Sequence, residues 1–177
     1  MKVLIVVDMQ NDFVSGALGT KEAVEIVPCV VGRTVEAVNS GETILFTRDT
    51  HAETYMTTQE GRNLPVPHCI RGSEGWEIVD QLQAYTAAAR VIDKPTCGSA
   101  ELGETLKALA AESHIEKITL IGLCTDICVI SNALLAKAFL PEAEVAVDAK
   151  CCAGVTPQSH STALAAMKMC QIKIENE

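Results

Sequence analysis

The segment 122–129 constrains the fold more than any other part of the sequence. A strand-like apolar run precedes it and an apolar helical pattern follows it, so we predict a tight turn from a strand into a helix. Cys128 would lie in the first turn of that helix, with Thr125 or Asp126 as its cap. Unpaired backbone N–H groups and the positive end of the helix dipole lower the pKa of a cysteine at such a position. Cys128 is therefore a candidate nucleophile, and the alternative is a buried structural cysteine.

The rest of the chain alternates short apolar runs with amphipathic helical patterns. We predict strands at residues 3–7, 43–47, 89–93, 117–121, 144–149 and 171–174. Helices are predicted between them at residues 24–39, 76–82, 99–111, 130–137 and 157–168. Strands that alternate with helices pair in parallel, and the helices pack on both faces of the sheet. The expected fold is one three-layer α/β domain over residues 1–177, with a six-stranded, mostly parallel sheet.

The composition argues against several classes of partner. The formal net charge is −9 and no stretch is rich in lysine or arginine, which speaks against nucleic acid and against an anionic membrane. The apolar run at the N-terminus is too short for a signal peptide, and no run approaches the length of a transmembrane span. We expect a cytoplasmic protein that acts on a small molecule and whose eight cysteines are reduced. Apart from Cys128, the cysteines are expected to be mostly packing residues: Cys29, Cys69, Cys97, Cys124, Cys151, Cys152 and Cys170.

Three chemically complementary side chains follow predicted strands. Asp8 ends the first strand, Lys94 lies at the exit of the third, and Cys128 follows the fourth. The carboxyl ends of parallel strands meet at one edge of the sheet, where α/β proteins bind their ligands. Acyl transfer by a thiol needs a proton acceptor, a cation beside the thiolate and the nucleophile itself. We predict that these three residues meet in one cleft, although each alone has an ordinary structural explanation.

A second group of residues predicts a metal site. Asp49 and His51 are two positions apart in an extended segment after the second strand, so their side chains point to the same side. His68 comes from the segment 52–75, which shows no periodicity, and completes a set that suits a divalent metal. Glu60 is a weaker candidate for a further ligand or an outer group. The alternative is an exposed aspartate and two surface histidines.

Five motifs, in order, resemble the isochorismatase-like cysteine hydrolases, and within that family the nicotinamidases. They are VDMQNDF at 7–13, TRDTH at 47–51, PHCIRG at 67–72, DKP at 93–95 followed by GS at 98–99, and GLCTDICV at 122–129. The resemblance covers nearly the whole chain. It implies the isochorismatase-like hydrolase fold and two sets of site residues: a catalytic triad of Asp8, Lys94 and Cys128, and a metal site of Asp49, His51 and His68. We also expect the chain to form a homo-oligomer.

The resemblance also implies a reaction. Asp8 takes the thiol proton, Lys94 holds the thiolate, and Cys128 attacks the carbonyl of a small amide such as nicotinamide, forming a thioester that water hydrolyses. In the family the peptide before the Thr-Asp turn is cis, which here is the bond before Cys124. The backbone N–H groups of Cys124 and Cys128 would then form the oxyanion hole. A divalent metal, zinc by its Asp/His ligands, would anchor the substrate and order water.

Two positions depart from the nicotinamidase pattern. Pro65 stands where nicotinamidases usually carry Trp or Phe, three residues before the metal-site histidine, and Glu101 stands where many relatives have Phe. Phe13 is the best remaining aromatic residue to contact a flat substrate. These changes leave the hydrolase chemistry in place but leave the substrate open, with N-carbamoyl, ureido and pyrazinamide-like amides as alternatives to nicotinamide.

Other interpretations fit the sequence less well. A receiver domain would place its Lys-Pro after the fifth strand, whereas Lys94 and Pro95 follow the third. A catalytically silent binding or scaffold protein would have no need for a reactive cysteine. Cys124 and Cys128 match neither a zinc spacing nor a Cys-x-x-Cys redox pair.

Overall fold

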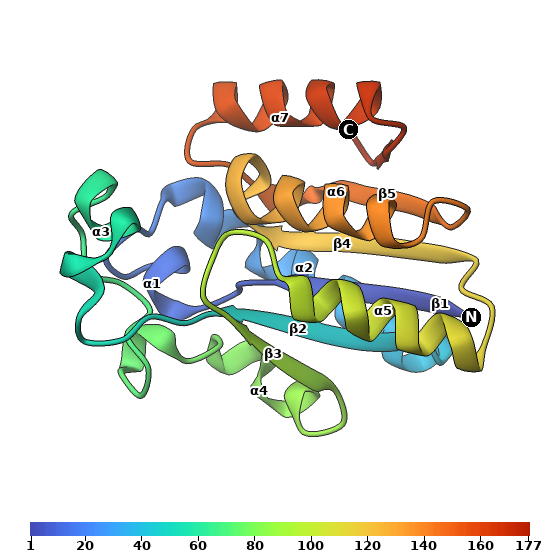
Figure 1. Cartoon of the computed structure of the whole chain (residues 1–177), viewed down its shortest axis with the longest axis horizontal. Helices are drawn as coiled ribbons and strands as arrows, with labels where there is room; N and C mark the ends of the chain where they lie inside the picture. The colour runs from blue at the N-terminus through green and yellow to red at the C-terminus, as the bar shows by residue number, and fades with distance from the viewer.

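The computed structural model describes all 177 residues, Met1–Glu177. Its centre is a six-stranded sheet in the order β3-β2-β1-β4-β5-β6, in which every neighbouring pair of strands is parallel. The predicted α/β fold is confirmed, and the sheet is entirely rather than mostly parallel (Figure 1). The strands are β1 (Lys2–Val7), β2 (Thr43–Asp49), β3 (Arg90–Lys94), β4 (Lys117–Leu123), β5 (Glu144–Ala153) and β6 (Lys173–Glu175).

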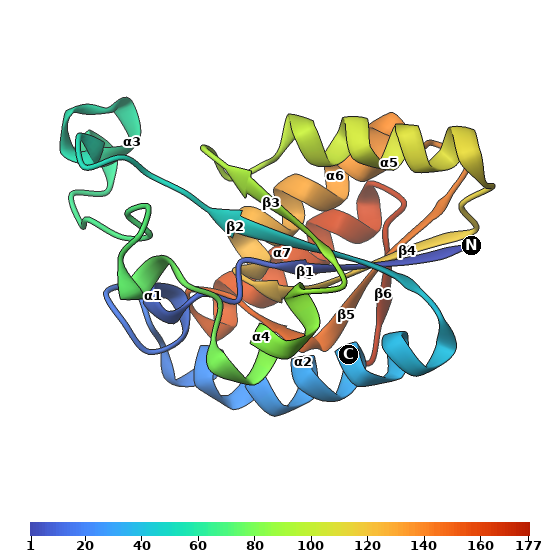
Figure 2. The same ribbon diagram turned by 90° about the horizontal axis from the view of Figure 1, so that it is seen from below.

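Helices cover both faces of the sheet, as Figure 2 shows when the sheet is seen nearly edge-on. One face carries α1 (Asn11–Val14), α2 (Lys21–Ser40) and α4 (Asp80–Thr86), and the other carries α5 (Ala100–Glu112), α6 (Ile130–Phe139) and α7 (Pro157–Met169). Alternate residues of the central strands supply the two cores, because side chains of a strand point to opposite faces in turn. In β1, for example, Ile5 packs in the core beneath α5–α7 and Val6 packs in the core beneath α2. No helix combines the length and the apolar character that crossing a membrane requires.

The fifth strand is longer than predicted. β5 runs to Ala153, whereas the sequence predicts an end at residue 149. The register between β4 and β5 shifts between Leu120 and Gly122, after which Gly122 pairs with Cys152 and Leu123 with Ala153. The sequence pattern misses this part of the strand because an exposed lysine and two buried cysteines interrupt its apolar run.

The helix predicted at 76–82 begins later, at Asp80. Trp76 instead ends a 3₁₀ turn, η2 (Glu74–Trp76), and the chain continues extended after it. Its ring lies under the guanidinium of Arg48, 3.4 Å from the ring centre, and its Nε1–H donates to the Thr50 hydroxyl at 2.8 Å. These contacts fix Trp76 against β2 and delay the start of α4.

The segment 52–75 is ordered, as expected from the sequence. It contains a 3₁₀ turn, η1 (Tyr55–Thr57), and the short helix α3 (Gln59–Asn63). Tyr55 is 1% exposed, and its hydroxyl donates to the Leu64 carbonyl at 2.9 Å. A Cβ at Gly61 would lie 2.1 Å from the Tyr55 carbonyl oxygen, so only glycine allows α3 to pack this closely. The packing folds the segment over the carboxyl end of the sheet.

Candidate active site

Asp8 and Lys94 form a fully buried ion pair at the exits of β1 and β3. Lys94 Nζ lies 2.7 Å from Asp8 Oδ2, and neither side chain is exposed. On the intervening strand β2, the Thr47 hydroxyl donates to Asp8 Oδ1 at 2.7 Å. Asp8 has a φ of 47°, in the left-handed region that aspartate tolerates better than most side chains, so the chain turns sharply as it leaves β1.

Burial acts on the pKa values of Asp8 and Lys94 in opposite directions. Burial raises the pKa of Asp8 and Asp49 adds to the rise, against the opposing effects of Lys94 and Thr47. Burial disfavours the charge of Lys94, but Asp8, Cys128 and Asp49 together hold its pKa well above the usual value. Lys94 is therefore an ammonium, and Asp8 is a carboxyl group ready to take up a proton.

Cys128 lies beside this pair, with its Sγ 3.5 Å from Lys94 Nζ. The structure thus brings together the three residues predicted at the strand exits. The helix around Cys128 needs a correction, because the residue lies in a single π-helical turn, η3 (Thr125–Val129), that leads into α6. Cys124 occupies the N-cap and no side chain caps the turn, so the predicted capping by Thr125 or Asp126 is wrong. Both side chains are engaged elsewhere.

The prediction of a lowered pKa for Cys128 is also wrong. The hydrogen bond with Cys97, burial and the Asp8 carboxylate raise the pKa of Cys128, and they outweigh the opposing effect of Lys94. A helix dipole contributes at most about 2 kcal/mol, and a buried site without a regular helical first turn gains less. The resting sulfur is a thiol, so a nucleophilic role requires a base, and the Asp8 carboxylate shares the Lys94 ammonium with this sulfur.

The backbone of the turn is shaped by a glycine. Gly122 has a φ of 112°, and a Cβ there would lie 2.1 Å from the Val7 carbonyl oxygen, so β4 approaches β1 closely only with glycine at this position. The peptide between Leu123 and Cys124 is cis. The Cys124 carbonyl accepts hydrogen bonds from Ile127 and Val129, while the Cys124 N–H has no acceptor in the protein. A free N–H thus lies in the same short turn as the thiol.

Side chains on both sides of the turn hold it in place. Thr125 is fully buried, and its hydroxyl shares a 2.8 Å hydrogen bond with Nδ1 of His160 on α7. The Asp126 carboxylate accepts a hydrogen bond from the Val155 N–H at 3.2 Å. Burial lowers the pKa of His160, so this ring is neutral at pH 7. The turn is therefore anchored to the chain that follows β5 and to α7.

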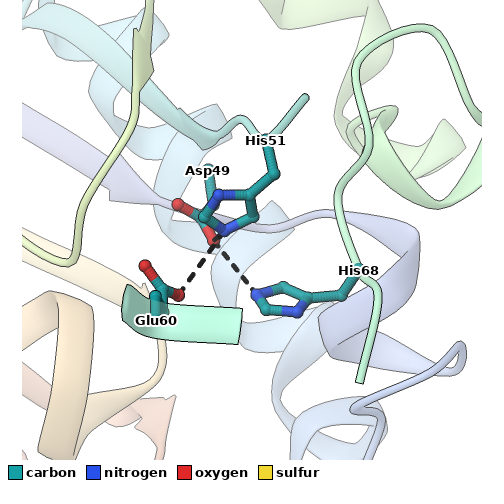
Figure 3. Close-up of side chains that lie close together, drawn as sticks. All are labelled: Asp49, His51, Glu60 and His68. Atoms are coloured by element: carbon teal, nitrogen blue, oxygen red, sulfur yellow. Dashed lines mark hydrogen bonds and ion pairs between the residues drawn. The ribbon is translucent and has the colours of Figure 1, made fainter. Parts of the chain in front are cut away.

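The residues predicted to bind metal also come together, as Figure 3 shows. One ligand atom from each of Asp49, His51, Glu60 and His68 lies within 4.8 Å of the other three. His51 Nε2 is 3.0 Å from Asp49 Oδ2 and 3.5 Å from Glu60 Oε1, and His68 Nε2 is 3.4 Å from Asp49 Oδ2. Glu60, the weaker candidate from the sequence, points into the same cluster from α3.

The chemistry of these donors fits a divalent cation. Ligand atoms that share one tetrahedral ion at about 2.0–2.2 Å lie roughly 3.3–3.6 Å apart. The His51–Glu60 and His68–Asp49 separations of 3.5 and 3.4 Å fall in this range, while the whole set of four extends to 4.8 Å. The Nδ1–H of His68 donates to the Val66 carbonyl at 2.8 Å, which turns Nε2 toward the cluster. Hydrogen bonds from His51 and His68, together with Lys94, lower the pKa of Asp49 although burial opposes this, so its carboxylate is ionised.

Lys94 connects the two groups of residues. Its Nζ lies 3.2 Å from Asp49 Oδ1, in addition to its contacts with Asp8 and Cys128. Asp49 is held by a buried glutamine, since Gln10 Oε1 accepts from the Asp49 N–H at 2.7 Å and Gln10 Nε2 donates to the Asp49 carbonyl at 2.8 Å. The candidate nucleophile and the candidate metal ligands therefore belong to one contiguous site.

A cavity of about 50 Å³ separates the thiol from the metal cluster. Phe13 lies on its wall, 8% exposed, with its ring centre 5.5 Å from that of His68. Leu64 and Ile127 are 37% and 38% exposed at its rim. The space holds a water or two, so a ring-sized substrate fits only after rim side chains move. The cavity is lined by Phe13, Leu18, Asp49, Glu60, Leu64, His68, Cys97, Cys124, Ile127 and Cys128.

The two residues that depart from the nicotinamidase pattern, Pro65 and Glu101, do not line this cavity. Pro65 is exposed, and Glu101 is an exposed residue that pairs with Arg90 at 3.1 Å. The aliphatic side chain of Leu64 lies at the rim instead. Apart from Phe13, no Phe, Tyr or Trp lines the cavity.

Several residues that shape the site give little signal in the sequence. Asp12 Oδ2 accepts from the Cys69 N–H at 2.7 Å and so fixes the chain beside His68. Asn132, fully buried on α6, donates to the Cys128 carbonyl at 2.8 Å. A buried asparagine in an otherwise apolar helix is the kind of signal that could have identified the latter residue.

Known proteins resemble this chain over nearly its full length. Residues 2–176 match the isochorismatase domain. A Bacillus subtilis (strain 168) protein, named "Uncharacterized isochorismatase family protein PncA", is 30% identical over 171 residues, which cover 92% of each chain. The nicotinamidase of Saccharomyces cerevisiae is 27% identical over 176 residues, covering 77% of this chain and 81% of the relative. The crystal structure of a Pyrococcus horikoshii pyrazinamidase in complex with zinc has a TM-score of 0.82 at 31% identity, covering 98% of this chain and 97% of the other.

Proposed function

The chain belongs to the isochorismatase family, and we propose on this basis that it is a cysteine amidohydrolase that cleaves nicotinamide to nicotinate and ammonia. The observation that carries the proposal is the position of the Lys94 ammonium, 2.7 Å from Asp8 and 3.5 Å from the Cys128 sulfur, which lines a small cavity. Relatives named nicotinamidase support the choice of substrate. The nicotinate produced would return to pyridine nucleotide biosynthesis and NAD salvage.

The reaction we propose begins with the removal of the thiol proton. Asp8, whose pKa is raised by burial, accepts the proton of Cys128, and the Lys94 ammonium stabilises the thiolate that results. The sulfur then attacks the amide carbonyl, and negative charge develops on the carbonyl oxygen. The N–H groups of Cys124 and Cys128 are the proposed donors to this oxygen, and one such donor is typically worth about 3 kcal/mol of transition-state stabilisation.

Asp8 has a second role in each turnover. The protonated carboxyl group gives its proton to the leaving ammonia as the C–N bond breaks, which leaves a thioester on Cys128. Asp8 then accepts a proton from water, and the hydroxide attacks the thioester to release the acid. Because Asp8 and Lys94 are both fully buried, solvent does not compete for these protons.

Asp49, His51 and His68 would hold a divalent cation, with Glu60 beside them, and their mixed oxygen and nitrogen donors suit zinc. When bound, such a cation supplies a Lewis acid that fixes the ring nitrogen of a pyridine or a water molecule. Phe13 would contact the flat face of the substrate.

A second substrate class is favoured by one observation. The cavity offers a single aromatic wall, and Leu64 at its rim is aliphatic. Such a pocket also suits small amides without a pyridine ring, among them N-carbamoyl and ureido compounds. Pyrazinamide-like amides remain candidates on the same geometry.

We also propose that the enzyme works in the cytoplasm as a homo-oligomer and binds neither nucleic acid nor membrane. A formal net charge of −9 supports the last two statements, since it opposes binding to polyanions. All eight cysteines are free thiols, which agrees with a reducing compartment.

An ammonia-release screen tests the proposed function. Nicotinamide, pyrazinamide, an N-carbamoyl amino acid and a ureido compound would be offered to the zinc-loaded wild type, to Cys128→Ala and to the surface control Cys170→Ala. We expect nicotinamide to be cleaved fastest, and we expect Cys128→Ala to lose activity by at least about 10³-fold. Full activity in Cys128→Ala would refute the nucleophile, and no ammonia from any of the four compounds would refute the amidohydrolase.

A further inference from the structure

A second thiol lies next to the candidate nucleophile. Cys97 belongs to the loop between β3 and α5, is partly exposed, and lines the same cavity as Cys128. Its side chain packs against the core cluster that contains Cys128, so the two thiols are neighbours at one small cavity of about 50 Å³. Cys97 has no role in the proposed hydrolysis, and from the sequence we predict only a packing role for it.

The backbones of the two cysteines are held side by side by one amide group. Nδ2 of Asn132, a fully buried residue, donates to the Cys128 carbonyl at 2.8 Å and to the Cys97 carbonyl at 3.2 Å. Its Oδ1 accepts from the Ser99 N–H at 2.9 Å, which fixes the end of the Cys97 loop. Disulfides need Cα atoms that are already close, usually within about 7 Å, so a clamp of this kind favours a bond without rearrangement of the backbone.

The Lys94 ammonium also holds the loop that contains Cys97, at a residue next to this cysteine. Lys94 Nζ donates to the Thr96 carbonyl at 3.1 Å, beside Cys97, while the same atom lies 3.5 Å from the Cys128 sulfur. Thiolates, and not thiols, react with peroxides and with other sulfur atoms, and a neighbouring ammonium stabilises a thiolate. The pair therefore has proximity, a fixed backbone and a local positive charge.

We infer that Cys97 and Cys128 form a site of reversible oxidation, in which a hydroperoxide converts the two thiols into a disulfide. This inference rests on the proposed function only for its consequence, which is that the disulfide blocks the nucleophile and switches hydrolysis off. The Cys128 sulfur attacks the peroxide once its thiol proton has left, and Cys97 is the resolving residue. A thiol reductant restores both.

The chemistry balances as two displacement steps. The Cys128 thiol gives up its proton and its sulfur attacks one oxygen of hydrogen peroxide, so that an S–O bond forms, the O–O bond breaks, and the second oxygen takes up that proton and leaves as water. The Cys97 sulfur then attacks the sulfenic sulfur, so that an S–S bond forms, the S–O bond breaks, and the hydroxyl leaves as water with the Cys97 proton. Two electrons pass from the two sulfur atoms to the peroxide.

A second pair of neighbouring cysteines provides a matched control. Cys29 on α2 and Cys151 on β5 also pack in one core cluster, on the other face of the sheet, and Cys151 is buried. Neither lines the cavity that contains Cys128, and neither contacts Lys94. If proximity alone caused oxidation, both pairs would respond equally to a peroxide.

The test treats the reduced, full-length protein with hydrogen peroxide, blocks free thiols with N-ethylmaleimide, and maps the peptides by mass spectrometry. We expect a cross-linked peptide pair that contains Cys97 and Cys128, removed by dithiothreitol, with loss and recovery of ammonia release in parallel. In Cys97→Ser, the same dose should carry Cys128 on to sulfinic acid, which dithiothreitol does not reverse. Cys29→Ser should behave as the wild type.

The outcomes separate this inference from the proposed function. Peptide mapping of the wild type needs no enzymatic activity, so a Cys97–Cys128 cross-link supports the inference even if no amide is cleaved. Recovery of Cys128 as a free thiol or a sulfinic acid, or a cross-link only between Cys29 and Cys151, overturns it. The wild-type map also decides the question if Cys97→Ser fails to fold.

Discussion

The two ends of the site are built in different ways. At the end that holds the candidate nucleophile, which we call the nucleophile end, Asp8, Lys94 and Cys128 leave three parallel strands and are at most 5% exposed. At the end that holds the candidate metal ligands, which we call the metal end, only Asp49 belongs to a strand, while Glu60 and His68 come from the ordered segment 52–75. Sheet hydrogen bonds fix the first end, whereas the second depends on a short helix and a few side-chain contacts.

Because of this difference, we expect the two ends to respond differently to amino-acid substitutions. A five-residue helix such as α3 is not stable by itself and needs its neighbours, here Tyr55 beneath Gly61. Glu60 on that helix keeps 34% of its side chain exposed and lies 3.5 Å from His51. Single substitutions at the metal end should therefore lower metal affinity by different amounts. A single substitution at the nucleophile end should abolish activity.

The largest effect is expected for Lys94→Met, which removes the only cation shared by both ends. Two carboxylates, Asp8 and Asp49, would remain buried without their partner, and breaking a buried pair in this way costs about 3–5 kcal/mol. Urea unfolding should show this loss, and ammonia release should fall by at least about 10³-fold. The control is Lys21→Met, whose 83% exposed side chain pairs with Glu25 and should contribute less than about 0.5 kcal/mol.

A smaller effect is expected for His68→Asn, which tests the metal end alone. Asparagine keeps a donor near the Val66 carbonyl but is too short to reach Asp49 Oδ2. Zinc affinity, measured by titration, should fall by about 100-fold or more, and Glu60→Gln should cost less than about tenfold. His114→Asn, an exposed histidine elsewhere, should change nothing. Equal losses for His68 and Glu60 would contradict the graded response.

Gly122→Ala tests the sheet that supports the nucleophile end. A Cβ at this position meets the Val7 carbonyl at 2.1 Å and the φ of 112° is unfavourable for alanine, so we expect about 2 kcal/mol of lost stability. Gly32→Ala is the matched control, because Gly32 lies in α2 with nothing within 4 Å of its Cβ position. That control should stabilise the protein by about 0.5–1 kcal/mol. Similar melting temperatures for the two variants would rule out the close approach of β4 to β1.

The smallest effect concerns pH and His160. Burial lowers the pKa of His160 in the folded protein, so below about pH 6.5 the unfolded state binds more protons and stability falls as the pH falls. His160→Asn should remove part of this loss between about pH 7 and 5, by less than about 1 kcal/mol because solvent reaches the ring. Chemical unfolding across this range measures the effect. A steeper decline in His160→Asn than in the wild type would be the opposite of the expected sign.

The nucleophile end was the easier one to predict from the sequence. Strand exits are marked by short apolar runs that end in a polar residue, and parallel strands deliver all such residues to one edge. Asp8, Lys94 and Cys128 could be placed together on this ground, while their catalytic roles stay predictions. The pKa of Cys128 was predicted with the wrong sign, because a motif shows the helix terminus but not the burial of the sulfur.

The metal end and the supporting residues were harder to predict. The segment 52–75 has no periodicity, so nothing in it indicates that α3 turns Glu60 toward His51. Asp12 and Asn132 form hydrogen bonds with backbone groups more than 30 residues away, and no local pattern encodes such contacts. The shifted start of α4 has the same cause, since the stacking of Trp76 on Arg48 is a tertiary contact.

Lys94 also makes the two ends interdependent. Its ammonium is shared among Asp8, Asp49 and the Cys128 sulfur, so any change of charge at Asp49 alters the field at the thiol. Thermodynamic reciprocity then requires the converse: if the cluster of Asp49, His51 and His68 binds a divalent cation, covalent capping of the sulfur must shift that affinity, through an effect transmitted by one side chain. A titration at either end thus reports on the state of the other, and the pocket behaves as a single electrostatic unit.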